Sequence, residues 1–273
     1  MHLGSLHTYP VKSCHRLDHH GSPVTVEPWG LTGDRRWLVV DPAGVGITQR
    51  EEPAMARINP APAAGGGLTL RAAGAPELPV AAPTGEPHRV RVHRDELTAT
   101  PAGPAADEWL TGVLGRPARL MWLDDPARRP VDPAYGRAAD RVSFADAYPL
   151  LLTNTASLGA VNDWLRAAGS GEGPLPMTRF RPNLVIAGAD PWVEDSWLGR
   201  RLAVGAVTFR VVKACGRCVM TTTDQETGAR GKEPLRTLAR HRTVNQKVIF
   251  GVNAIPDPPY GEITASDPVT LLD

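Results

Sequence analysis

The sequence predicts a mixed, mainly β protein with a few short helices, and three observations lead to this prediction. The 27 glycines and 27 prolines among 273 residues favour many turns between short elements. Short apolar runs typical of strands recur along the chain, whereas helical periodicity is confined to a few segments. Hydrophobic residues (42%) and charged residues (22%) are as frequent as in ordinary globular proteins, and the length suits about two domains.

The N-terminal half predicts a small sheet or barrel followed by one helix. Apolar runs at 24–26 and 35–41 have the composition of strands, and turn residues separate them. Residues 60–83 are rich in Ala, Gly and Pro, which predicts edge strands and loops. Residues 88–93 alternate apolar and basic side chains at the strand period, whereas 105–115 carry apolar residues at the helical period. A strand followed by a helix is therefore expected.

A proline-rich, charged segment lies near the middle of the chain. Residues 124–141 combine these two properties, which predicts an exposed linker or lid that could form the rim of a site. We therefore expect an N-terminal domain of residues 1–125 and a C-terminal domain of residues 126–273.

The C-terminal half predicts further strands and two helices. The apolar run 149–154 predicts a buried strand, and 156–169 predicts a helix whose N-cap is Asn154 or Thr155 and which ends at Gly169. The rest of the chain has the same character. Strands are expected within 183–188, 201–215, 247–256 and 268–273, and a short helix within 234–242.

Charge and cysteine content exclude several classes of protein. The formal net charge of +1 and the pI near 7.8 provide no field for nucleic acid or an acidic membrane. The N-terminus lacks a signal-peptide pattern, and no window approaches about 18 consecutive apolar residues. Three cysteines, two of them only three residues apart, do not form a disulfide framework. We expect a cytoplasmic protein without a membrane anchor.

The most informative segment is a C-x-x-C pair, Cys215 and Cys218, at the end of a long apolar run. Half of a zinc site is one interpretation, but the other candidate ligands are crowded on a distant loop around Cys14. A thioredoxin-like pair should open a helix, whereas residues 219–223 are expected to continue as β-structure. In the third interpretation one thiolate binds another group, and the neighbouring Lys213 and Arg217 favour the thiolate form.

A family resemblance adds to these alternatives. Residues 214–238 (ACGRCVMTTTDQETGARGKEPLRTL) resemble the signature of the MOSC domain, the C-terminal domain of molybdenum-cofactor sulfurases. They are most similar to the branch that contains the mitochondrial amidoxime reducing component and its bacterial relatives. Residues 9–14 (YPVKSC), 30–41 (GLTGDRRWLVVD) and 47–58 (ITQREEPAMARI) are similar to the domain that precedes MOSC there. The resemblance implies an N-terminal β-barrel-like domain followed by a β-barrel MOSC domain.

The resemblance also implies a site for the molybdenum cofactor, molybdopterin. In the family the metal is held by the second cysteine of the C-x-R-C motif, which is Cys218 here, and Cys215 does not ligate it. The resemblance implies pyridoxal phosphate binding only at the level of the domain. Further residues fall where the family contacts the phosphate, the pterin or the metal end of the cofactor. They are Lys12, Ser13, Arg35, Arg181, Asn183, Gly216 and Arg217.

Two asparagines complete the candidate set. Asn253 stands where the human member of the family has a tyrosine, so it could hydrogen-bond the cofactor but offers no stacking surface. Asn154, with Thr155 and Ser157, lies at the expected start of a helix, where unpaired N–H groups can bind an anion. Helix capping is the alternative role for Asn154 and Thr155.

The activity implied by the resemblance is reduction of N-hydroxylated small molecules, namely amidoximes, hydroxamic acids and hydroxylamino bases, to the amine or amidine plus water. The sequence stops at Asp273 with the last expected strand, 268–273, and does not include the C-terminal iron–sulfur domain that some bacterial relatives carry. We therefore expect electrons to come from a separate donor such as a small cytochrome, a ferredoxin or a flavoprotein reductase. Neither a nucleic acid nor a membrane is an expected partner. The alternatives are a carrier of the cofactor or of its sulfur without turnover, and a zinc-stabilised interaction domain.

Overall fold

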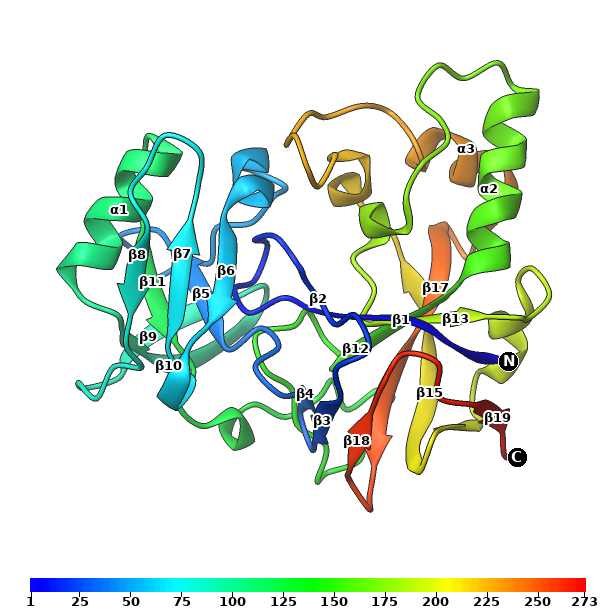
Figure 1. Ribbon diagram of the computed structural model, residues 1–273, viewed down its shortest axis with the longest axis horizontal. Coiled ribbons are helices and arrows are strands. Elements are labelled where there is room, and N and C mark those ends of the chain that lie inside the picture. Colours follow the sequence, from blue (N-terminus) through cyan, green and yellow to red (C-terminus); the bar gives the residue numbers. More distant parts are fainter.

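Strands from both ends of the chain meet in one large sheet. The computed structural model describes residues 1–273 and has two lobes of mainly β-structure (Figure 1). The larger lobe contains a nine-stranded sheet, and the N-terminal strand lies inside it. In spatial order its strands are β19 (Val269–Leu271), β14 (Arg201–Val204), β15 (Val207–Gly216), β17 (Lys247–Asp257), β12 (Leu150–Asn154), β13 (Leu184–Ala187), β1 (His2–Thr8) and β2 (Leu17–Asp18), and β16 (Thr243–Val244) pairs with β17.

The inner face of this sheet is apolar because its strands alternate buried and exposed residues. Its core joins Leu3 and Leu6 of β1 with Leu150, Phe209 and Val252. Three short strands also contribute to this core, in a sheet ordered β18 (Glu262–Ile263), β3 (Val24–Glu27) and β4 (Gly30–Leu31). Residues 2–8 and 24–31 therefore pack with the C-terminal half, and a domain division at residues 125 and 126 stays a prediction.

The smaller lobe has two sheets and one helix, which pack around Trp37, Met55 and Leu110. The helix α1 (Pro104–Leu114) begins at a proline, whose missing N–H costs nothing there, and ends at Gly115 in the left-handed conformation. The strands form two groups. One sheet is ordered β5 (Trp37–Val40), β11 (Arg119–Trp122), β10 (Asp95–Pro101) and β9 (His88–Val92), and the other β6 (Asn59–Pro62), β7 (Leu68–Arg71) and β8 (Leu78–Val80).

Two helices lie at the outer side of the larger lobe, α2 (Thr155–Ala167) and α3 (Leu235–His241). No helix in the structure is long and apolar enough to cross a membrane. The remaining helical segments are short 3₁₀ turns. They are Pro53–Arg57, Ala64–Gly66, Pro126–Arg128, Met177–Phe180, Val193–Trp197 and Val219–Thr222.

The antiparallel pair β15 and β17 leads from the core to the polar region between the lobes. Its register shifts twice near the end of β15, and side chains from Val212 to Cys215 are only partly buried. Gly251 of β17 lies at this irregularity with φ +74°, and a Cβ there would lie 2.7 Å from the carbonyl oxygen of Leu152. Only glycine suits that position. The pairing sets Lys213 opposite Asn253, so both side chains point to one face.

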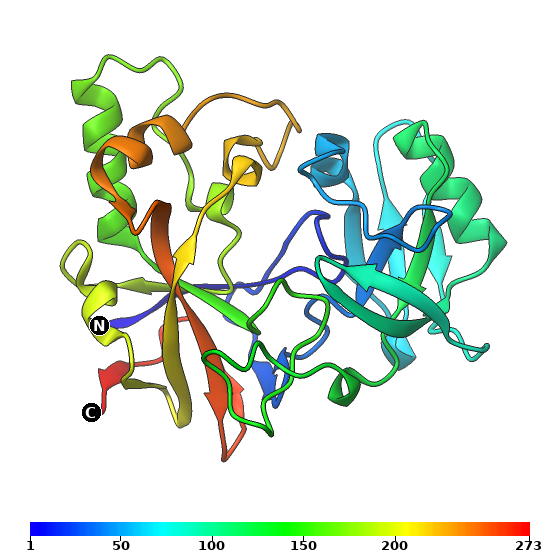
Figure 2. The same cartoon turned by 180° about the vertical axis from the view of Figure 1, so that it is seen from behind.

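The mainly β fold class with few helices is confirmed, and one local prediction is wrong. Val219–Thr222 forms a 3₁₀ turn, although its β-branched composition predicted β-structure, because the hydroxyls of Thr221 and Thr222 donate to the carbonyl oxygens of Cys218 and Val219. Residues 124–141 run between the lobes (Figure 2) and are largely exposed. Buried Arg129 fixes them, donating to Asp95 Oδ2 at 2.6 Å and to the Asp146 carbonyl oxygen at 2.7 Å.

Candidate active site, a cationic cavity between the lobes

A cavity of about 370 Å³ opens between the lobes and gathers almost all of the predicted site residues. Its volume lies in the range of small-molecule and cofactor sites. Segments far apart in the sequence line it, from residue 12 to residue 253. The predicted residues in its wall are Lys12, Ser13, Arg35, Arg181, Asn183, Gly216, Arg217, Cys218 and Asn253.

Positive charge dominates the cavity wall. Eight basic side chains face one carboxylate, that of Asp146. Low-dielectric walls concentrate such a field, so the cavity favours an anionic occupant. The eight are Lys12, Arg35, Arg50, Arg179, Arg181, Lys213, Arg217 and Lys247.

Lys12 and Asp146 form the ion pair on one side of this cavity. The Lys12 ammonium is nearly enclosed and donates to the Phe144 carbonyl oxygen at 2.7 Å and to Asp146 Oδ1 at 2.6 Å. The charge of Lys12 holds the pKa of Asp146 well below its usual range. Asp146 is therefore ionised at neutral pH and orients Lys12.

The ring of Tyr9 supports two guanidinium groups. Arg35 lies 4.6 Å from the ring centroid and Arg181 lies 4.2 Å from it. The Tyr9 hydroxyl donates to the Pro182 carbonyl oxygen at 3.0 Å, and burial raises the pKa of Tyr9 to about 12. The phenol is thus neutral and holds both cations by cation–π contact. Arg35 also donates to Asn183 Oδ1 at 3.1 Å, so Asn183 helps to fix its direction.

Three of the predicted residues have a strained backbone. Ser13, Arg35 and Arg181 have φ values of 67°, 49° and 55°, the left-handed region that non-glycine residues rarely adopt. Each costs about 1 kcal/mol or more. The buried Ser13 Oγ and Arg181 Nη2 also have no hydrogen-bond partner in the protein. Strain and unpaired donors in one cavity are the features of a site that an external ligand completes.

A buried pair of amides connects the two lobes behind Ser13 and Arg181. Gln49 Nε2 donates to Gln225 Oε1 and Gln225 Nε2 donates to Gln49 Oε1, both at 3.0 Å. Gln49 Nε2 also donates to the Ser13 carbonyl oxygen at 2.7 Å, and Arg181 Nη1 donates to Gln225 Oε1 at 2.8 Å. The two glutamines therefore position a residue from each lobe.

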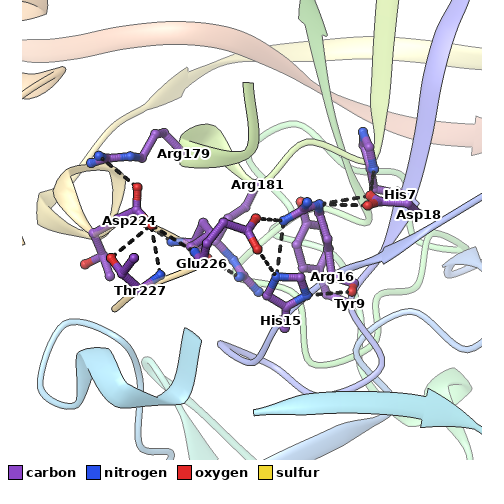
Figure 3. A network of polar contacts seen from close by, with 12 residues as sticks. His7, Tyr9, His15, Arg16, Asp18, Arg179, Arg181, Asp224, Glu226 and Thr227 are labelled. Atoms are coloured by element: carbon purple, nitrogen blue, oxygen red, sulfur yellow. Dashed lines mark hydrogen bonds and ion pairs between the residues drawn. The ribbon is translucent and has the colours of Figure 1, made fainter. Parts of the chain in front are cut away.

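An ionic network extends this connection on the same side (Figure 3). Arg16 donates to Glu226 Oε1 at 2.6 Å and to Asp18 Oδ1 at 2.9 Å. Asp18 in turn contacts His7 Nδ1, and Asp224 accepts from Arg179 at 3.3 Å. The loop after the C-x-R-C motif is thereby fixed to the loop after β1. Asp224 also caps its own turn, accepting from the backbone N–H groups of residues 226 and 227.

The two cysteines of the motif have different neighbours. Arg217 Nη1 donates to Cys215 Sγ at 2.9 Å, and its Nη2 donates to the Phe180 carbonyl oxygen at 2.7 Å. Arg50 lies beside Cys218; burial lowers the pKa of Arg50, but the contacts with Cys218 and Asp146 raise it overall. Arg217 therefore lies beside a thiol of the motif, as the sequence indicates, whereas the sequence gives no sign of Arg50 beside Cys218.

The third cysteine, Cys14, lies outside the cavity wall, and no cluster of metal-ligating side chains is present. Burial raises the pKa of the Cys14 thiol to about 12, so it is neutral and part of the smaller lobe's core. The structure contains no group of three or more His, Cys, Asp or Glu side chains arranged to hold a metal ion. A structural zinc site around Cys215 and Cys218 would need two more such ligands.

Asn154 is the one predicted site residue outside the cavity wall. It is the N-cap of α2, and its Oδ1 accepts from the Ala156 N–H at 3.0 Å. Its Nδ2 donates to the Asp190 carbonyl oxygen at 2.7 Å and to Glu194 Oε2 at 3.1 Å. Its oxygen thus caps the helix, the alternative role that the sequence leaves open, and its amide nitrogen bonds to residues outside the helix.

Sequence reasoning missed several cavity residues. Arg50 lies inside the segment 47–58, but no spacing marked it as a neighbour of Cys218. Arg179 stands two residues before Arg181, which is the only signal that it carries. Asp146 and Tyr148 lie in a segment without a recognisable motif, and their place depends on how residues 124–148 cross between the lobes.

Comparisons with known proteins agree with this architecture. Residues 1–117 match the MOSC N-terminal beta barrel domain and residues 139–270 match the MOSC domain. Mitochondrial amidoxime-reducing component 1 of Homo sapiens is 35% identical, over 99% of this chain and 82% of that protein. The protein of the same name from Mus musculus is 33% identical, with the same two coverages. Molybdenum cofactor sulfurase of Danio rerio is 31% identical over 92% of this chain, which spans 31% of that protein. The chain therefore belongs to the MOSC family, among members in which a MOSC N-terminal β-barrel domain precedes the MOSC domain.

Proposed function

We propose that this protein is a molybdenum-cofactor-dependent reductase of N-hydroxylated compounds. The reaction would cleave the N–O bond of an amidoxime, a hydroxamic acid or a hydroxylamino base with two electrons and two protons, giving the reduced nitrogen compound and water. The observation that carries the proposal is the placement of Cys218 in the same cavity as the unpaired donors Ser13 Oγ and Arg181 Nη2. The similarity to the amidoxime-reducing components supports the reaction type.

The residues present suit this cofactor. A phosphorylated pterin needs cations and neutral donors for its phosphate, and the cavity offers Lys12, Arg35 and Arg181 with the hydroxyl of Ser13. A pterin edge needs amide and backbone partners, which Asn183 and Gly216 can supply. A soft metal needs a thiolate ligand. Cys218 lies beside Arg50 and is only partly buried, so a metal can reach its sulfur.

The protein's part in the proposed reaction is to hold and orient the cofactor. When bound, the molybdenum centre supplies the two electrons that reduce the N–O bond. Cys218 would fix the metal end, while Lys12, Ser13, Arg35 and Arg181 would anchor the phosphate end between the lobes. Asp146 stays ionised beside Lys12 and therefore acts as an ion-pair partner rather than as an acid. Arg217 fixes Cys215 and the Phe180 backbone, which keeps the motif's loop in place.

Metal content tests the proposal. The wild type and Cys218→Ala should be expressed in a host that makes the cofactor and analysed for molybdenum by mass spectrometry. We expect close to one molybdenum per wild-type chain, its loss in the variant, and reduction of benzamidoxime with a chemical electron donor by the wild type alone. Wild-type protein that lacks molybdenum despite cofactor supply would overturn the proposal. In the cell a separate protein, a small cytochrome, a ferredoxin or a flavoprotein reductase, would supply the electrons.

A carrier of the cofactor or of its sulfur is the second candidate function. The similarity to the sulfurase over 92% of this chain favours it. A carrier would hold molybdenum but release the intact cofactor to a recipient apoprotein, and it would not reduce benzamidoxime. Turnover with the chemical donor therefore distinguishes the two functions, since both predict a metal-loaded protein.

A further inference from the structure

Most of the cations in the cavity already have partners in the protein. Lys12 pairs with Asp146, Arg35 with Asp34, and Arg179 with Asp224. Arg50 lies beside Cys218 and Asp146, Arg217 donates to Cys215, and Arg181 donates to Gln225. The side chains of Lys213 and Lys247 make no hydrogen bond and no ion pair. Of these two, Lys247 is exposed, and Lys213 is partly buried in the wall.

Aromatic rings rather than an acid hold Lys213. Its Nζ lies 4.8 Å from the ring centroid of Tyr135 and 5.5 Å from that of Tyr148. The two rings meet edge to face, with centroids 6.3 Å apart. Cation–π contact directs an ammonium without neutralising its charge, so Lys213 keeps its charge and has no hydrogen-bond acceptor in the protein.

The segment that carries these rings is anchored to both lobes. The Tyr148 hydroxyl donates to Asp132 Oδ2 at 3.3 Å, which ties the ring to the turn that precedes Tyr135. Arg137 donates to Asp257 of β17 at 2.9 Å, and Arg129 donates to Asp95 of the smaller lobe. The rings therefore form a fixed wall beside Lys213, although Tyr135 itself is 49% exposed.

We propose that Lys213, with Tyr135 and Tyr148, is a substrate subsite that binds an anionic group, a carboxylate or a phosphate, on an N-hydroxylated substrate with a flat, conjugated body. This inference rests on the proposed function and specifies its substrate class. Lys213 stands two residues before Cys215 on β15 and lines the same cavity as Cys218. A substrate whose anionic group pairs with Lys213 would lie along the wall that leads to Cys218, with the flat Tyr148 ring beside it.

The test compares matched neutral and anionic substrates on the molybdenum-loaded protein. Benzamidoxime is paired with 4-carboxybenzamidoxime, and N4-hydroxycytidine with its 5′-monophosphate, and each is reduced with a chemical donor. In Lys213→Met we expect kcat/KM for an anionic substrate to fall about 10- to 100-fold, mainly through KM, because one charged hydrogen bond is lost. The neutral substrates should change less than about threefold. The pair that responds distinguishes a carboxylate from a phosphate.

Two further variants separate a local contact from the general field. Lys213→Arg should retain most of the preference, since it keeps the charge. Lys247→Met removes the same charge from the exposed lysine of the wall, where solvent screens it, so kcat/KM should fall less than about threefold for the anionic substrates and stay unchanged for the neutral ones. Equal losses for both substrate types in Lys213→Met, no loss for either, or loss of molybdenum from that variant would overturn the subsite.

A binding measurement on the oxidised protein without any electron donor separates this inference from the proposed function. Calorimetry should show that 4-carboxybenzamidoxime or the nucleotide binds about 10- to 100-fold more weakly to Lys213→Met than to the wild type. If that difference is found but no compound is reduced, the anion subsite stands and the reductase assignment falls. If benzamidoxime is reduced but neither anionic compound depends on Lys213, the subsite falls alone.

Discussion

Replacement of Arg181 by methionine should stabilise the protein free of cofactor while it abolishes cofactor binding. Burial lowers the pKa of this guanidinium from 12.5 to about 10, and its Nη2 has no partner. At about 1.4 kcal/mol for each tenfold change, the buried charge costs the native state about 3 kcal/mol. Loss of the contact with the Tyr9 ring, 4.2 Å away, and of the hydrogen bond to Gln225 Oε1 returns about 2 kcal/mol of that. The net gain of about 1 kcal/mol corresponds to a Tm about 2–4 °C higher.

The assay is thermal unfolding of protein made in a host that cannot synthesise the cofactor, followed by molybdenum analysis of protein made in a competent host. Arg179→Met is the matched control, because Arg179 is also a buried cavity arginine but has partners in the Thr222 carbonyl oxygen and Asp224. Its removal deletes both of these hydrogen bonds from a buried guanidinium, although the Thr222 carbonyl oxygen still accepts from the Gly231 N–H, and should lower stability by about 1–3 kcal/mol. A cofactor-free Arg181→Met that melts below the wild type, as Arg179→Met should, would refute the reasoning that Arg181 is an uncompensated charge awaiting an anion.

Three further outcomes are expected. Cys218→Ala should lose molybdenum by elemental analysis, whereas Cys215→Ala should retain most of it; equal loss would exclude Cys218 as the sole thiolate ligand. Gln49→Leu should cost about 1–3 kcal/mol in urea unfolding and weaken cofactor retention, because Ser13 and Gln225 lose a buried partner; unchanged retention would contradict its positioning role. Burial lowers the pKa of His7 despite the raising effect of Asp18, so the folded state binds fewer protons than the unfolded state. Stability should therefore fall as pH drops below about 6.5. Tm measured from pH 7.5 to 5 should show this fall, and His7→Gln should make it smaller.

Most strands and helices could be predicted from the sequence, because the patterns that indicate them extend over only a few neighbouring residues. The alternating run at 88–93 corresponds to β9 (His88–Val92), and the helical run at 105–115 corresponds to α1 (Pro104–Leu114). The prediction of β-structure after Cys218 was wrong because it too relied on local composition alone. Its β-branched residues favour strands, but the threonine hydroxyls bond to the preceding backbone and make a 3₁₀ turn. A side-chain bond of this kind has no signature in composition.

The candidate site, too, could be predicted only in part. Residues inside quoted motifs, such as Lys12, Arg35 and Cys218, could be named because the resemblance marks them one by one. Asp146 and Tyr148 could not, since what brings them to the cavity is the course of residues 124–148 between the lobes. Asn154 is the opposite case, a residue predicted for the site that lies outside the cavity wall. The start of α2 looked like an anion site, but the N-cap side chain is already satisfied by Ala156, Asp190 and Glu194.

The proposed cofactor contacts come from both lobes, so the two lobes would act together in binding it. Lys12, Ser13 and Arg35 come from the N-terminal part of the chain, whereas Arg181 and Cys218 come from the larger lobe. An anion bound among them would relieve the charge of Arg181 and supply the partner that Ser13 lacks, so ligand binding and contact between the lobes stabilise each other. Strain at Ser13 and Arg181 would then be offset, because the ligand would supply the hydrogen-bond partners that the protein does not. Cofactor loading should therefore raise Tm in the wild type, and in Arg181→Met this increase should be smaller even at equal cofactor supply.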